Sequence, residues 1–174
     1  SPNHLDRHGT YENYVVAKLA LLNNQPADGW AVLNTGDDHL RSIAPDLPGR
    51  IAWFSAEPGS KTTPSGPGAW IENGTVMRST GDSTSPVFPA DAIPLLGKHN
   101  QENVAAAVAA TAFWGEGDGS VPVEVVADAV RSFPGVEHRL ELVRTVNGVR
   151  WFNDSISTTP ESTICALRSF QPGK

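Results

Sequence analysis

The first regular spacing of apolar side chains in this sequence is helical. It predicts a helix over residues 10–22, because side chains three and four positions apart share one face of a helix. The residues on that face are Tyr14, Ala17, Lys18 and Leu21. Thr10 can cap the helix, since its hydroxyl oxygen can accept a hydrogen bond from a free N–H group of the first turn. We therefore expect a helix whose apolar face carries one lysine.

Short apolar runs after this helix predict strands. Their bounds are residues 29–34 and 50–55, followed by a hairpin over residues 69–78. The pair Asn73–Gly74 is typical of the two-residue turn that closes such a hairpin. Residues 57–68 and 81–94 are rich in Gly, Pro, Ser and Thr, so we expect loops there.

The second half of the chain alternates between helical and strand patterns. An alanine-dense helix is expected over residues 100–114, and another over residues 121–132 with Ser120 as its cap. The elements predicted after Phe133–Pro134–Gly135 are strands over 139–146 and 148–153, joined by an Asn147–Gly148 turn, and a helix over 160–170. Strands that alternate with helices predict a layered α/β fold.

The composition is that of a folded, acidic protein. The chain has 174 residues, of which 39% are apolar and 18% are charged, and it has a net charge of −6 and a pI of about 5.3. Nucleic acid is not an expected partner, because its phosphates are bound by basic faces. The one cysteine, Cys165, cannot form an internal disulfide, which fits a reducing cytoplasm. We expect Cys165 to be a small buried residue on a helix.

No targeting or membrane-spanning segment is predicted from the sequence. Residues 1–7 lack the apolar core of a secretory signal, and the run over 104–114 is too short to span a bilayer. These observations favour a cytoplasmic protein with no membrane partner, and we expect a monomer. Both ends of the chain are expected to be cut points rather than natural termini.

Several short strings hold side chains that could carry chemistry. They are Asn3-His-Leu-Asp-Arg-His-Gly9, Tyr14-Val-Val-Ala-Lys18, Gly97-Lys-His-Asn-Gln-Glu-Asn103, Phe133-Pro-Gly-Val-Glu-His-Arg-Leu-Glu-Leu-Val143 and Trp151-Phe-Asn-Asp-Ser155. Taken alone, such strings have ordinary explanations: a polar loop before a helix, a solvated lysine, a helix cap or a surface ion pair. A phosphate loop of the form G-x-x-x-x-G-K-[ST] is absent from the sequence.

Together, these strings resemble the Mur ligases, the ATP-dependent enzymes that add amino acids to the peptidoglycan precursor. They are most similar to the glutamate-adding branch. The resemblance implies part of a three-layer central ATPase domain over residues 1–133, followed by the start of a Rossmann-like C-terminal domain over 134–174. It implies that the whole enzyme uses ATP to add D-glutamate to UDP-N-acetylmuramoyl-L-alanine through an acyl phosphate. The fragment alone is then expected to be inactive.

The resemblance also implies roles for individual residues. It places His4 at a Mg²⁺ ion, together with Lys18 as a carbamate, whose oxygens suit a hard cation. Burial beside Ala17 would favour the neutral amine of Lys18, the form that reacts with carbon dioxide. The residues implied at the nucleotide are Asn100, Asn103, Arg139 and Asp154. Those implied near the incoming amino acid and phosphate are Ser155 and Thr158.

Two positions depart from the family pattern. Asn3 stands where the family has aspartate, and Ile156 stands where many glutamate-adding ligases have a lysine that contacts phosphate or carboxylate. The second departure indicates a divergent subgroup. An L-glutamate-adding or other amino-acid-adding Mur ligase is therefore one alternative. A second alternative, which the missing phosphate loop would support if this were the entire natural protein, is a nucleotide- or sugar-binding module without ligase activity.

Overall fold

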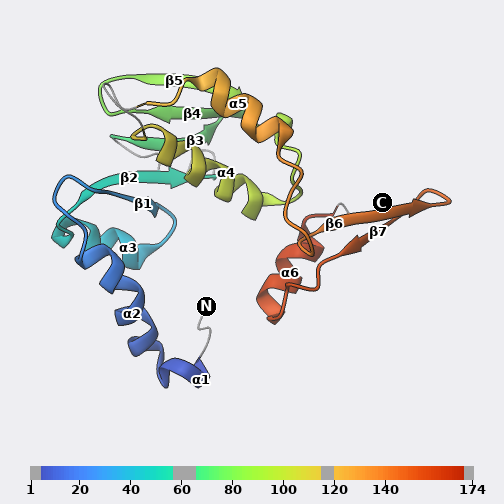
Figure 1. Cartoon of the computed structure of the whole chain (residues 1–174), viewed down its shortest axis with the longest axis horizontal. Helices are drawn as coiled ribbons and strands as arrows, with labels where there is room; N and C mark the ends of the chain where they lie inside the picture. The colour runs from blue at the N-terminus through green and yellow to red at the C-terminus, as the bar shows by residue number, and fades with distance from the viewer. Residues whose placement is uncertain (1–4, 57–65, 115–119, 171–174) are drawn as a thin grey trace.

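A five-stranded sheet is built from the short apolar runs of the sequence. The computed structural model describes residues 5–56, 66–114 and 120–170 (Figure 1). The strands are β1 (Trp30–Asn34), β2 (Arg50–Ser55), β3 (Gly68–Glu72), β4 (Thr75–Ser79) and β5 (Thr84–Pro89), in that order across the sheet. β1, β2 and β3 are parallel, whereas β4 and β5 are antiparallel additions. The β3–β4 hairpin turns at Asn73 and Gly74, both with positive φ, as predicted.

Helices cover both faces of this sheet, which confirms the layered α/β fold. They are α3 (Asp38–Ile43), η1 (Ala44–Asp46), η2 (Ala90–Ala92), α4 (Lys98–Thr111) and α5 (Val123–Ser132). α4 and α5 lie on one face, where Val108 and Val126 join a core with Val76. On the other face, Ala31 and Leu33 of β1 pack with Ala44 and residues of α3. The alternation of side chains along β1 thus serves two separate cores.

Two sequence predictions in this part of the chain are wrong. Residues 84–89 form strand β5 rather than a loop. The sequence pattern does not indicate this strand, because it contains prolines, which cannot donate a hydrogen bond to the neighbouring strand. Pro86 and Pro89 are tolerated because β5 is the last strand in the sheet order, beside a register shift at Val76/Met77. Ser120 does not cap α5, because the helix begins only at Val123.

A helical arm precedes the sheet. It consists of α1 (Leu5–His8) and α2 (Tyr11–Asn23), and Thr10 caps α2 as predicted by accepting a hydrogen bond from the Asn13 N–H group at 3.2 Å. The predicted burial of Lys18 is wrong for the described structure, because α2 has no buried residue and Lys18 is exposed. The apolar face of the arm is uncovered over most of its length, and Leu21 is 76% exposed.

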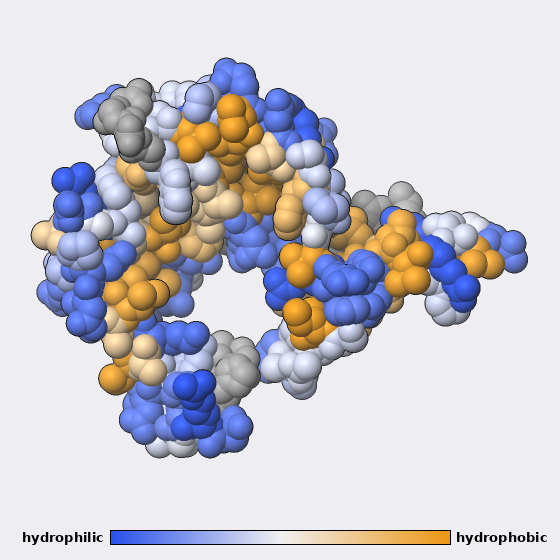
Figure 2. Space-filling view, in the orientation of Figure 1, coloured by the Kyte–Doolittle hydropathy of each residue, from blue (hydrophilic) through white to orange (hydrophobic). Residues whose placement is uncertain are grey.

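The last part of the chain is a two-stranded hairpin and one helix. β6 (Glu141–Val146) and β7 (Val149–Asn153) are antiparallel, and α6 (Pro160–Arg168) follows with the capping box of Thr159. Figure 2 shows hydrophobic residues on the surface of this hairpin, and its exposed large apolar side chains are Leu142, Val143, Val146, Val149 and Trp151. Cys165 lies on α6 but is exposed, so its predicted burial is wrong: the neighbouring Ala166 occupies the buried side.

Among the described residues, none of the helices is both long enough and apolar enough to cross a bilayer. The longest are α4 and α2, and both belong to the layers and arm described above.

Gly68 of β3 pairs with Trp53 of β2, and the space beside it leaves no room for a side chain. A Cβ atom added there would overlap the carbonyl oxygen of Trp53, and the φ angle of Gly68 is +152°. Gly68→Ala should therefore lower the free energy of unfolding by about 1–2 kcal/mol for the backbone conformation and by a further ~1–3 kcal/mol for the overlap. Urea denaturation followed by tryptophan fluorescence measures this loss. Gly74→Ala is the matched control, because its φ is +74° and nothing lies within 4 Å of the added atom. Equal losses in the two variants would contradict the steric explanation.

Candidate functional site

The start of α4 lies against the end of α6. Gly97 is the N-cap of α4, with a φ of +92°. A Cβ atom added to Gly97 would overlap Oγ of Ser169 and lie 2.9 Å from Cε1 of His99. Glycine is therefore required for the close approach of these two helices. This contact places the predicted string from Gly97 to Asn103 beside the hairpin and α6.

A cavity of about 200 Å³ lies at this junction. Its lining residues are His99, Arg139, Leu140, Asp154, Ser157, Ser162, Cys165 and Ala166. Arg139 and Asp154, which the sequence analysis assigned to a nucleotide, are thus brought together with the first turn of α4. His99, Ser157 and Cys165 were not identified from the sequence. His99 belongs to the string from Gly97 to Asn103, but the pattern alone does not indicate that this residue lies beside Arg139 and Asp154.

Hydrogen bonds hold Arg139 and Asp154 in one local structure. The N–H group of Leu140 donates to Oδ1 of Asp154 at 3.0 Å, across 14 residues of sequence. The N–H group of Arg139 donates to the carbonyl oxygen of Val136 at 3.1 Å. Asp154 therefore keeps its other carboxylate oxygen for a ligand, while it fixes the chain next to Arg139.

The two predicted asparagines contact each other on α4. Asn100 is buried and its Nδ2 donates to the carbonyl oxygen of Leu96 at 2.7 Å, while Nδ2 of Asn103 donates to Oδ1 of Asn100 at 3.2 Å. Asn103 is exposed, so it has more freedom to contact a ligand. Asn100 and Arg139 also line one cavity of about 540 Å³ between α4 and the hairpin. Their assignment to the nucleotide stays a prediction.

The pKa of the His99 imidazole is lowered by its surroundings in the junction. Burial lowers the pKa of its imidazole below the ordinary 6.5, and the positive charge of Arg139 lowers the pKa further, whereas Asp154 and Glu102 oppose the shift. The neutral ring is therefore favoured. A neutral imidazole has one donor and one acceptor nitrogen, which suits hydrogen bonding to a ligand or to a serine hydroxyl.

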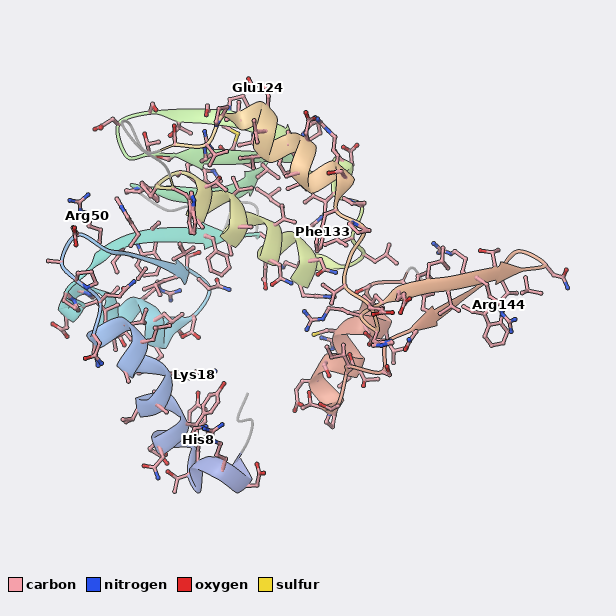
Figure 3. The ribbon with its side chains drawn as sticks, viewed as in Figure 1. His8, Lys18, Arg50, Glu124, Phe133 and Arg144 are labelled. Carbon is pink, nitrogen blue, oxygen red and sulfur yellow. The ribbon has the colours of Figure 1, made fainter. Side chains whose placement is uncertain are left out.

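Other predicted site residues lie outside this cavity. Lys18 is on the arm, with Nζ 5.6 Å from the centroid of the Tyr14 ring, and Figure 3 shows it away from α6. His4 lies outside the described residues. Ser155 and Thr158 are exposed and do not line the cavity. Within residues 5–56, 66–114 and 120–170, no group of three or more His, Cys, Asp or Glu side chains is arranged to hold a metal ion.

A second polar cavity, of about 560 Å³, lies at the carboxyl ends of β1 and β2. Its lining residues are Asn34, Gly36, Asp37, Asp38, His39, Ser55 and Glu102. Parallel sheets commonly bind ligands at this edge. Two of its acids already serve α3: Asp37 caps the helix by accepting from the Leu40 N–H group, and Asp38 pairs with Arg41. The sequence analysis missed this cavity, although the carboxyl ends of two neighbouring strands were a usable signal.

The charges around His99 lead to a test of the junction. Arg139→Ala should raise the pKa of His99, because removal of a nearby positive charge makes the imidazolium less unfavourable. Asp154→Asn should lower the pKa of His99, because a stabilising negative charge is lost. Both shifts can be measured by NMR titration of the ring proton on Cε1, assigned by its absence in His99→Gln. An unchanged pKa in both variants would show that the three side chains do not share one site.

Comparison with known proteins places this chain in a family. Residues 1–111 match the family described as the Mur ligase middle domain. The chain is 41% identical over 169 residues to a UDP-N-acetylmuramoylalanine–D-glutamate ligase from Symbiobacterium thermophilum, an alignment that covers 96% of this chain and 35% of the relative. It is 40% identical over 175 residues to the enzyme of that name from Acidobacterium capsulatum, covering 99% of this chain and 36% of the relative.

Solved structures share the fold at lower sequence identity. MurF from Acinetobacter baumannii superposes with a TM-score of 0.69 at 20% identity, over 97% of this chain and 35% of that protein. MurF from Thermotoga maritima, solved in complex with ADP, superposes with a TM-score of 0.60 at 17% identity, over 95% of this chain and 36% of that protein. The chain spans about a third of the length of the curated relatives it matches. Because the middle-domain family covers residues 1–111, more than half of the sequence, the chain belongs to the Mur ligase family.

Proposed function

We propose that the whole protein uses ATP to join D-glutamate to UDP-N-acetylmuramoyl-L-alanine through an acyl phosphate. The observation that carries this proposal is the identity of 40–41% to two D-glutamate ligases over 96–99% of this chain. The junction cavity supports the proposal, because it joins a guanidinium, a carboxylate and a neutral imidazole at the start of α4.

Each group at the junction suits one part of a nucleotide. The planar, permanently charged guanidinium of Arg139 suits phosphate oxygens. The free carboxylate oxygen of Asp154 suits a ribose hydroxyl, as in dinucleotide-binding folds. The amides of Asn100 and Asn103 offer donors and acceptors to the adenine edge. Ser155 and Thr158 are assigned to the acceptor amino acid and the phosphate, on the loop that follows β7.

Two parts of the chain contribute to this site, and we infer that they belong to two domains. Residues 1–133 form the later part of the central ATP-binding domain, and residues 134–174 form the beginning of a Rossmann-like C-terminal domain. The connection around 133–136 is a hinge in this proposal. Closure about it would press Arg139 and Asp154 onto a nucleotide held by α4, as in other enzymes that close over their substrates.

Magnesium would be held by His4 and by Lys18 in its carbamate form. This role of Lys18 is supported by the string Tyr14-Val-Val-Ala-Lys18 and not by burial, because the amine is exposed in the described structure. The carbamate would supply the oxygen ligands that Mg²⁺ prefers. The ion would supply positive charge against the transferring phosphoryl group. The protein is further inferred to act as a monomer in the cytoplasm, with no nucleic-acid or membrane partner, in line with its acidic composition.

Phosphate release tests the reaction and its stereochemistry. The natural full-length protein should release phosphate from ATP in the presence of UDP-N-acetylmuramoyl-L-alanine and D-glutamate, and not with L-glutamate. Turnover only with L-glutamate would show that the protein is an L-glutamate-adding ligase. Ile156, which departs from the pattern of many D-glutamate-adding ligases, is the reason to test this acceptor. Turnover only with meso-diaminopimelate or lysine would reject the glutamate assignment. Nucleotide binding with no turnover on any acceptor would favour a non-catalytic nucleotide-binding module.

The carbamate assignment of Lys18 has its own readout. Incubation of the full-length protein with ¹³C-bicarbonate should give a carbamate carbon signal in the NMR spectrum that is absent from Lys18→Ala. The same variant should lose at least about 100-fold in turnover, because charge on the transferring phosphoryl group is no longer offset. Lys61→Ala is the control lysine. Full activity of Lys18→Ala, or an identical carbon spectrum for the variant and the natural protein, would rule out the role.

A further inference from the structure

Arg139 lies between two residues in left-handed backbone conformations. His138 has a φ of +66° and Leu140 a φ of +46°. Residues other than glycine rarely adopt such φ angles, and interactions with the surrounding structure have to offset the free-energy cost of this conformation. Because the backbone is strained on both sides of Arg139, we expect hydrogen-bonding side chains that stabilise this turn.

Glu141 holds the first side of this turn. Its Oε2 atom accepts a hydrogen bond from the His138 N–H group at 2.8 Å and one from Nδ2 of Asn153 at 3.3 Å. Nδ2 of Asn153 also lies 2.8 Å from Nδ1 of His138, and that ring nitrogen is 3.7 Å from Oε2 of Glu141. The carboxylate thus joins the turn to the end of β7 on the partner strand.

Asp154 holds the second side, through the Leu140 N–H group described above. The N–H groups of His138, Arg139 and Leu140 are therefore all paired, and two of their three acceptors are carboxylates. Hydrogen bonds to charged acceptors are stronger than neutral ones. The turn is clamped at both ends by negatively charged side chains.

The guanidinium of Arg139 is not held in the same way. Among the described residues, it has no hydrogen-bond or ion-pair partner, and the side chain is exposed. The conformation of the backbone then sets the point at which the side chain of Arg139 leaves the chain, beside the cavity that it lines with His99 and Asp154. A loss of the clamp at Glu141 would release the turn and leave the cation without a fixed direction.

We propose that Glu141 is a positioning residue that presents Arg139 to the phosphates of the nucleotide. This inference rests on the proposed role of Arg139 in nucleotide binding. Glu141 acts through the reach of its carboxylate to the His138 N–H group, and not through a contact with the ligand. Its effect on binding should therefore disappear once Arg139 is removed.

Binding of a non-hydrolysable ATP analogue, adenylyl imidodiphosphate, to the natural full-length protein tests this by calorimetry. Arg139→Ala should weaken binding about 30-fold, as expected for a lost charge-assisted contact. Glu141→Ala should weaken it about 10-fold, and the double variant should bind no more weakly than Arg139→Ala alone, because coupled residues are not additive. Glu161→Ala, which removes an exposed carboxylate of α6 that lines neither cavity, is the control and should bind as the natural protein does.

Two conservative variants separate reach from charge. Glu141→Gln keeps an acceptor oxygen at the same reach and should bind within about 3-fold of the natural protein, because the neutral oxygen still accepts from the His138 N–H group, although more weakly than the carboxylate does. Glu141→Asp keeps the charge but shortens the side chain, so it should weaken binding about as much as alanine, and it replaces Glu141→Ala if that variant does not fold.

The outcomes distinguish this inference from the proposed function. If the natural protein does not bind the analogue, the nucleotide role fails and the inference falls with it. If the natural protein binds and Arg139→Ala weakens binding, but Glu141→Ala and Glu141→Asp do not, only the inference is overturned. Additive losses in the double variant would also overturn it, because they would give Glu141 a role independent of Arg139.

Discussion

The close packing of α4 on the sheet determines where the candidate nucleotide-binding side chains lie. Ala105, Val108 and Ala109 are completely buried, and the helix extends across four strands of the sheet. Small side chains permit this close approach. In such tightly packed interiors, deletion or enlargement of a buried group lowers stability. Because the helix is fixed along its length, its first turn is held at one position. His99 and Asn100 are presented there to the hairpin and α6.

The part of the chain that meets this first turn has little core of its own. A two-stranded hairpin is only marginally stable alone, and most of the large apolar side chains of β6 and β7 are exposed. Gly97 of the first part lies against Ser169 of this part. Within this part, Phe152 packs on Phe170 with ring centroids 4.9 Å apart. A nucleotide held between the two parts would stabilise their contact, since a ligand favours the state that binds it. Binding and closure are then one process.

Local chemistry in the sequence predicted much of the backbone. The cap at Thr10 and the turns at Asn73–Gly74 and Asn147–Gly148 depend on neighbouring residues only, and the structure has all of them. β5 was missed because pairing at a sheet edge overrides the unfavourable prolines. The exposure of Cys165 and of Lys18 depends on what covers each helix, which spacing along the chain does not record. The site was predicted in part: Arg139 and Asp154 do meet, but the contributions of His99 and Glu141 arise from contacts between distant strands and helices.

Few positively charged groups line the junction cavity, so the position of Arg139 matters for binding a phosphate there. Among the described residues that line the cavity, Arg139 is the one permanent cation, and the lowered pKa of His99 keeps the imidazole neutral at neutral pH. Ile156 is 50% exposed on the following loop and supplies no charge. A phosphate bound here would therefore depend on a single guanidinium, whose interaction with the phosphate falls off with distance and with exposure to water. Strained backbone on both sides of Arg139, held by two carboxylates, is the arrangement that keeps such a lone charge in one direction.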